Sequence, residues 1–311
     1  MTALMVHVED YLRLRRHLGF VLEAPERLLR QFVSHLDDAG MKMITVEAAV
    51  AWAGAPSLRP VADSGLRAAV RLTAVRGLAE YLHAIDPAHQ VPPRGVFSSP
   101  RNRHEPFIYG REQIAALLQT TRELPGDGRG RTWSTVFGLL AVTGIRIGEA
   151  LLLRQADTDL VGGVLTVSRN KNRHPRLVPL RRDSVEALDD YAQWRERERP
   201  AHSTTEAAFF TGTWGKPLSY SAALAAFQRA SAAAGLREDG NRPRIHDLRH
   251  TFAVTTLLGW YRDGVDVAAM MPVLSTYLGH MNPIDTYWYL SAVPELMAHA
   301  AERLDAVRSR S

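Results

Sequence analysis

Apolar residues recur at helical spacing through the first 85 positions of the chain. One set repeats every three or four residues, as the buried face of a helix requires, and consists of Leu28, Leu29, Phe32, Val33 and Leu36. Residues 6–18, 46–52 and 66–82 share this spacing. The N-terminal part is therefore predicted to be all-α, with about four helices.

The pattern stops between residues 87 and 106. This stretch has no apolar period and contains five prolines and several arginines, a composition typical of a linker. We therefore place an N-terminal helical domain at 1–86, a linker at 87–106 and a second domain at 107–311.

The second domain combines helices with a short hairpin. Residues 107–118 form a helical pattern, and 132–153 indicate two helices that are interrupted near Thr143-Gly144. Two apolar runs at 164–167 and 177–180 flank a polar tip and predict a β-hairpin. The rest is helical again, so the fold is predicted to be mainly α with a small β-sheet, an α+β domain.

Composition restricts the compartment and the partner. A length of 311 residues suits two domains, and 46% hydrophobic residues suffice for packed cores. The net charge of +5 and the pI near 9.7 are compatible with a nucleic-acid partner. Without cysteine there are no disulfides or thiolate metal sites, and no apolar run approaches the ~20 residues that span a bilayer. We expect a soluble, unprocessed, cytoplasmic protein that does not enter a membrane.

Arg146 lies at a predicted helix start, with Glu149 three residues later, so the two side chains share a face and could pair. On its own this pattern describes a solvated ion pair. The surrounding residues are apolar, however, and a cation is costly to place there, which favours a buried or anion-facing arginine equally well.

His246 and Arg249 are also three residues apart, so on a helix both could reach one phosphate. A different class remains open, because His246 and His250 have the spacing of the helical zinc motif of metalloproteases. That motif uses glutamate as the base, whereas Asp247 stands here and Arg249 would lie beside the metal. Stoichiometric zinc in the purified protein would support the metalloprotease.

Lys171 stands at the polar hairpin tip of a chain in which only three of 38 basic residues are lysine. An amine can donate a proton at usable pH and a guanidinium cannot, so a general acid would explain this choice. A surface lysine without function is the alternative.

Three tyrosines near the C-terminus, Tyr277, Tyr287 and Tyr289, are candidate nucleophiles. Read alone, an aromatic cluster of this kind is typical of core packing.

Taken in order, five segments of the chain resemble the tyrosine recombinases, the family of phage integrases and Xer-type resolvases. They are Thr143 to Glu149, Lys171 upstream of Arg176-Leu177-Val178-Pro179-Leu180, His246 to Ala253, Leu278-Gly279-His280, and Tyr289 nine residues after His280. The resemblance covers about residue 107 to the C-terminus.

The resemblance implies an enzyme that cleaves and rejoins DNA through a 3′-phosphotyrosine, with Tyr289 as the nucleophile. Arg146 and Arg249 would hold the scissile phosphate, and His246 would accept the phenol proton. Lys171 would protonate the 5′ oxygen, and His280 would donate a hydrogen bond to the phosphate. Neither a cofactor nor a metal is implied.

The same resemblance implies that the N-terminal domain binds DNA and closes around the duplex with the catalytic domain as a clamp. Partners would be double-stranded recombination sites, three further copies in a synaptic tetramer, and accessory proteins or sister recombinases. Residues 294–307 have an apolar face that suits a helix packed on a neighbour or on its own domain. The long interval from Arg249 to His280 is similar to that of transposon-borne recombinases.

Two further functions stay open at this stage. A type IB-like DNA topoisomerase would share such a site but act as a monomer, and a strand-transfer assay on two duplexes separates it from a recombinase. A catalytically silent DNA-binding accessory protein is disfavoured by the complete set of catalytic residues.

Overall fold

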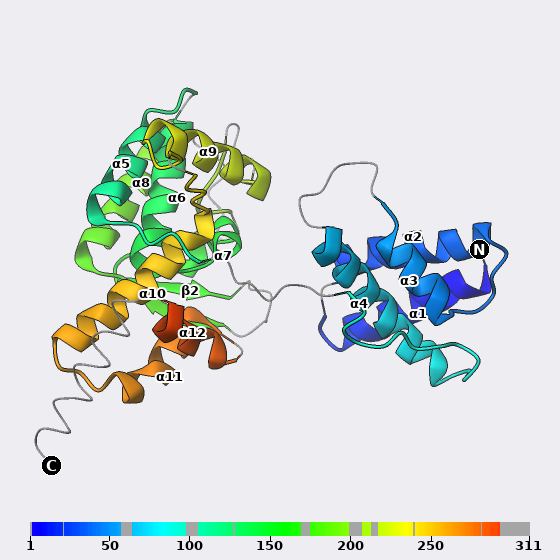
Figure 1. Ribbon diagram of the computed structural model, residues 1–311. Helices are drawn as coiled ribbons and strands as arrows, with labels where there is room; N and C mark the ends of the chain where they lie inside the picture. Colours follow the sequence, from blue (N-terminus) through cyan, green and yellow to red (C-terminus); the bar gives the residue numbers. More distant parts are fainter. Residues whose placement is uncertain are drawn as a thin grey trace, which may run out of the picture. The chain divides into compact units, whose positions relative to one another are not determined.

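The computed structural model describes residues 2–20, 22–56, 64–97, 105–126, 128–168, 175–198, 207–212, 217–238, 240–280 and 282–292. The chain divides into two compact units, an N-terminal unit, Met1–Arg103, and a C-terminal unit, His104–Ser311 (Figure 1). This division falls inside the predicted linker. Two predicted features, Lys171 and the tail helix at 294–307, lie outside the described residues.

The N-terminal unit is helical, as predicted. Its helices are α1 (Ala3–His17), α2 (Glu23–Asp38), α3 (Val46–Gly54) and α4 (Ser64–His83). Helix α4 packs against the other three, and the predicted apolar face of α2 is buried in their shared core. The side chains of Thr2 and Thr45 cap α1 and α3 by accepting a hydrogen bond from the backbone N–H three residues later.

Part of the predicted linker packs on this unit. Nδ1 of His89 lies 3.1 Å from the backbone nitrogen of Ile44 and accepts its hydrogen bond, and His89 is buried. The guanidinium of Arg76 on α4 donates to the carbonyls of Pro92 and Pro93, both at 2.8 Å. The packing of this segment was not predicted because polar contacts fix it, and such contacts produce no apolar period in the sequence.

The C-terminal unit contains helices on either side of a small sheet in the chain order. Its elements are α5 (Arg111–Arg122), α6 (Arg129–Thr143), α7 (Ile147–Leu151), the 3₁₀ helix η1 (Gln155–Asp157), β1 (Thr158–Asp159), β2 (Val164–Val167), β3 (Arg176–Pro179), α8 (Arg182–Glu198), α9 (Tyr220–Ala233), α10 (Ile245–Arg262), α11 (Val267–Leu278) and α12 (Ile284–Ala292). The mainly α fold with a small sheet is thus confirmed.

The predicted hairpin is present. Strand β2 pairs antiparallel with β3, with Val164 opposite Pro179 and Val167 opposite Arg176. The strand order is β1-β2-β3, and the two-residue strand β1 was not predicted because it is too short to show alternation.

Helix α5 begins four residues later than predicted. Gly110 is its N-cap residue, and the backbone N–H of Gly110 donates to the side chain of Gln113 at 2.9 Å. The preceding residues 105–109 form no helix or strand, and the backbone N–H of Tyr109 donates to Oγ1 of Thr251 at 3.0 Å. The apolar residues before Gly110 therefore belong to a segment that packs on α10.

Helix α10 connects the parts of this unit that carry the five segments resembling the tyrosine recombinases. It packs against α6, α11 and α12, and α11 also contacts β3 (Figure 1). The apolar residues of α10, α11 and α12 form a core of their own, which includes Leu257, Met271 and Leu278. None of the described helices is long and apolar enough to cross a membrane.

Candidate active site

Arg249 on α10 is the largest fully buried side chain described, with 1% of its surface exposed. Its Nη1 donates to the carbonyl of Gly144 and its Nη2 to the carbonyl of Leu278, both at 2.8 Å. Its Nε is buried and has no hydrogen-bond partner among the described residues. Burial, together with the charge of Arg146, lowers the pKa of Arg249 to about 10. A buried cation with an unused donor is costly, so the site is prepared for an anion.

Arg146 lies beside it at the start of α7. Its Nη1 donates to Oε1 of Glu149 at 3.0 Å, and its Nη2 donates to the carbonyl of Gly279 at 3.1 Å. The predicted Arg146–Glu149 pair is confirmed. About a third of the Arg146 side chain remains exposed, so this arginine can contact a ligand as well as its protein partners.

Glu149 is shared by two arginines. Besides Arg146, it accepts two hydrogen bonds from Arg176 on β3, at 3.0 and 2.7 Å. Burial alone would raise the pKa of Glu149, but the hydrogen bonds from Arg176 and from the backbone of Arg146 outweigh it and hold the pKa below its ordinary value. The carboxylate therefore stays charged and fixes both guanidinium groups. Sequence reasoning assigned Arg176 no role, because only the fold brings β3 next to α7.

Two glycines present the carbonyls that hold the arginines. Gly144 ends α6 at φ +62°, and Gly279 ends α11 at φ +69°. Both lie in the left-handed region that favours glycine. A Cβ on Gly144 would lie 2.5 Å from Phe252, and one on Gly279 would lie 2.8 Å from Arg176, so neither site has room for a side chain.

The hydroxyl of Tyr289 lies 3.2 Å from Nδ1 of His250. Tyr289 is only 2% exposed, whereas Tyr287 on the same helix is 48% exposed. The third candidate, Tyr277, is half-buried and stacks on Phe252 at 5.6 Å. Of the three tyrosines, Tyr289 is thus the one placed beside a histidine that can share its proton.

The remaining predicted histidines surround this group. The rings of His246 and His250 meet edge to face at 4.7 Å, and the ring of His280 stacks on Tyr289 at 6.4 Å. Nδ1 of His280 lies 2.7 Å from Oγ1 of Thr286. Burial and the charges of Arg249 and Arg146 lower the pKa of His280 to about 4. Part of the His246 side chain is exposed, but partial desolvation and positive neighbours hold its pKa below the ordinary value as well. The rings of His246 and His280 are therefore both neutral at pH 7.

Five of the six predicted site residues therefore gather in one place. They are Arg146, His246, Arg249, His280 and Tyr289, drawn from α7, α10, the turn after α11, and α12. Lys171 is outside the described residues. The structure adds Glu149, Arg176 and His250 to the group.

The side chains that could bind a metal do not form a complete metal site within the described ranges. No group of three His, Cys, Asp or Glu residues that could bind a metal occurs there. Asp247, the acid of the zinc-like pattern, instead accepts hydrogen bonds from the backbone and the guanidinium of Arg244 and so caps α10.

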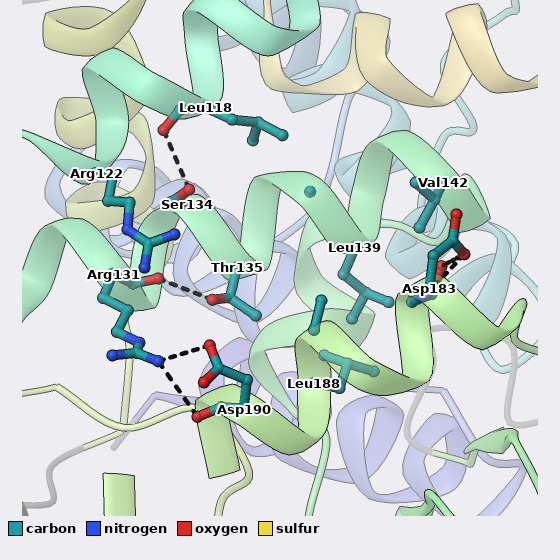
Figure 2. A pocket seen from close by; sticks show the side chains of 13 residues that line it. Leu118, Arg122, Arg131, Ser134, Thr135, Leu139, Val142, Asp183, Leu188 and Asp190 are labelled. Atoms are coloured by element: carbon teal, nitrogen blue, oxygen red, sulfur yellow. Dashed lines mark hydrogen bonds and ion pairs between the residues drawn. The ribbon is translucent and has the colours of Figure 1, made fainter. Parts of the chain in front are cut away.

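One cavity adjoins this cluster and another lies apart from it. A recess of about 690 Å³ at the start of α10 is lined by three arginines, Arg237, Arg242 and Arg244, by His246, and by the carboxylates of Glu105 and Asp247, so a mildly basic recess adjoins the site. A separate pocket of about 310 Å³ lies between α5, α6 and α8 (Figure 2). Its rim includes an ion pair of Arg131 and Asp190, and it contains none of the predicted site residues.

A buried arginine with an unused donor, next to a tyrosine paired with a histidine, suits the transfer of a phosphoryl group to tyrosine. The model of the phage integrase family matches residues 110–295. The chain belongs to the phage integrase family and is a tyrosine-type site-specific recombinase, which cuts and rejoins DNA strands.

Relatives match over nearly the whole chain. The protein y4rB of Sinorhizobium fredii, described as an integrase/recombinase, is 39% identical over 96% of both chains. The tyrosine recombinase XerD of Mycobacterium tuberculosis is 31% identical over 94% of this chain and 96% of its own. The Tn1549 transposon integrase, solved in complex with transposon right end DNA, is similar in fold, with a TM-score of 0.65, 19% identity and coverage of 96% and 99%.

Proposed function

We propose that Tyr289 is the residue that attacks DNA and that Arg146 and Arg249 hold the scissile phosphate. The observation that carries this assignment is the buried guanidinium of Arg249, whose Nε has no partner among the described residues. Two arginines around one phosphate would stabilise the charge that develops in the transition state. Their carbonyl and carboxylate partners fix them before DNA arrives, so no reorganisation is needed during the reaction.

The other predicted residues supply and remove protons. A phenol has a pKa near ~10, so attack at neutral pH requires a base close to the hydroxyl. The neutral ring of His280 stacks on Tyr289 and can donate a hydrogen bond to the phosphate. The neutral ring of His246 meets His250, which pairs with the tyrosine hydroxyl, so a histidine of this pair can accept the proton of the phenol. Lys171 would protonate the departing 5′ oxygen. The result is a 3′-phosphotyrosine, a step that uses neither ATP nor a metal.

Replacement of the nucleophile tests this assignment. Tyr289→Phe should abolish the covalent adduct between protein and DNA while binding to DNA persists, because only the hydroxyl is lost. The measurement is denaturing gel electrophoresis of the enzyme with a labelled, nicked substrate. Tyr287→Phe is the matched control on the same helix, and an adduct that disappears in the control instead would disprove the assignment.

The role of Lys171 has its own test. Lys171→Arg should cripple cleavage of an ordinary substrate, because a guanidinium does not release its proton at usable pH. A substrate with a 5′-thiol leaving group needs no protonation and should be cleaved at close to the wild-type rate. Equal damage on both substrates would remove Lys171 from the acid role.

We further propose how the whole chain acts. The N-terminal unit would bind the duplex together with the basic recess at the start of α10, and four copies would assemble on two recombination sites in the cytoplasm. Accessory proteins or a sister recombinase would set direction. The similarity of fold to a transposon integrase supports a transposition-type task. Sedimentation of the full chain and of a chain truncated after Leu290, with and without site DNA, tests the tetramer and the part of the tail in it.

A further inference from the structure

The hydroxyl of the proposed nucleophile is paired with a histidine to which the motif segments assign no catalytic role. In the motif, His246 and Arg249 are the assigned residues, yet Nδ1 of His250 is 3.2 Å from Oη of Tyr289. The two rings are 5.5 Å apart and inclined by 62°. This hydrogen bond joins α10 to α12, the helix that delivers the nucleophile.

His250 is held in place by rings on several sides. Trp288 on α12 lies 5.4 Å from His250 and 5.4 Å from Tyr289, and His246 meets His250 edge to face at 4.7 Å. The next residue back on α10 is Arg249, whose guanidinium is fixed by two backbone carbonyls. A rigid helix therefore places the phosphate-binding arginine and the partner of the phenol in adjacent positions.

We infer that His250 is a catalytic residue that holds the hydroxyl of Tyr289 and takes its proton when the phenol attacks. This inference rests on the proposed function of Tyr289. In the step, the O–H bond of Tyr289 breaks and the proton passes to Nδ1 of His250. The bond from Oη to phosphorus forms, and the bond from phosphorus to the 5′ oxygen breaks. That oxygen takes a proton from Lys171, and rejoining returns each proton to its source.

The surroundings favour this division of work between the two histidines. Among the described residues, the charged and titratable groups that face His250 include His246 and Arg249 on its own helix and Tyr289 on α12, with His280 on the other side of the tyrosine ring. His246 is exposed at the edge of the basic recess, which suits contact with the DNA phosphate. His250 is half-buried and already in contact with the reacting oxygen.

The test uses the full chain and a nicked suicide substrate, with the rate of adduct formation measured in single turnover from pH 5 to 9. His250→Ala removes the base. His250→Asn is the matched variant, because an amide oxygen can still accept the hydrogen bond but cannot carry the proton. We expect both variants to be slower by about 10²-fold or more and to lose the decline in rate at acid pH that protonation of the base causes. Added imidazole should restore part of the rate of His250→Ala.

The outcomes separate three explanations. If His250→Asn keeps the wild-type rate and pH profile, His250 only positions the tyrosine and the inference is overturned. If His246→Ala alone removes the acid decline, the base is His246. If the wild type itself forms no adduct, the proposed function fails, independently of His250.

A measurement on the wild type covers the case in which the variants do not fold. In ¹⁵N spectra of the free protein at pH 8, Nδ1 of His250 should be unprotonated and hydrogen-bonded, and its signal should shift in Tyr289→Phe. A protonated Nδ1 would contradict the inference, because it could donate to the phenol but not receive its proton.

Discussion

At the scale of single residues, Glu149 determines whether two arginines keep their positions. Glu149→Ala leaves the buried charge of Arg176 and the partly exposed charge of Arg146 without their carboxylate. We therefore expect the free energy of unfolding to fall by about 3–5 kcal/mol and adduct formation to slow, as measured by chemical denaturation and by the cleavage assay.

The control for this change is Glu186→Ala. Glu186 pairs with Arg182, but their side chains are 65% and 93% exposed, so water screens the pair. Its loss should cost less than about 1 kcal/mol. Equal losses in the two variants would mean that the buried pair contributes no more than a surface pair.

His280 should make stability depend on pH. Its pKa is about 4 in the folded protein against an ordinary value of 6.5, so the unfolded chain binds more protons between these values. The free energy of unfolding is therefore greatest above pH 6.5 and falls toward pH 4, by up to about 1.4 kcal/mol per pH unit for this group. Denaturation curves at pH 7, 6 and 5 measure this slope. His280→Asn should flatten it, and an unchanged slope would assign the effect to other groups.

Residue identity along the chain was enough to propose a nucleophile and two arginines, which the structure brings together, but it did not indicate their partners. The spacing of Arg146 and Glu149 on one helical turn predicted their ion pair. Arg176 and His250 were quoted in the motifs without a role, because their contacts join a strand to a helix and one helix to another. Such contacts depend on tertiary packing, which periodicity does not describe.

At the scale of elements, the end of α6 should tolerate no side chain. Gly144→Ala combines a left-handed backbone with a Cβ only 2.5 Å from Phe252, so either the ring or the carbonyl that holds Arg249 must move. We expect a loss of stability well above the roughly 1 kcal/mol of backbone strain alone, together with slower cleavage. Thermal denaturation and the adduct assay measure the two effects.

Gly264→Ala is the matched control. Gly264 also has a positive φ, +72°, but no atom lies within 4 Å of the point that an added Cβ would occupy. Only the backbone cost should appear there, with cleavage unchanged. If the two variants lose the same stability and keep the same rate, crowding at Gly144 has no part in the site.

Helices and the hairpin were predictable because each buries one regular face. The start of α5 was misplaced because Phe107 and Tyr109 are apolar residues of a segment without regular secondary structure, and apolar content alone does not distinguish that segment from a helix. Residues 87–93 looked like free linker because backbone carbonyls, which carry no sequence signal, attach them to α4.

At the scale of the whole molecule, binding should depend steeply on salt. Each DNA phosphate neutralised by an arginine releases counterions, so affinity should fall by about 10³-fold or more between 50 and 200 mM salt. Fluorescence anisotropy with a labelled recombination site measures this dependence. A flat response would contradict an interface made mainly with the DNA backbone.

The arginines of the site are aimed by main-chain oxygens at two helix ends. The positions of both guanidinium groups therefore depend on the glycines of these turns and on the number of residues between Thr143 and Arg146 and between Leu278 and His280. Insertion of one amino acid in either turn would move the carbonyl that binds Arg146 or Arg249 and so displace the guanidinium. All motif residues would still be present in the sequence. A design that transfers this chemistry to another scaffold would therefore have to include both turns as well as the motif residues.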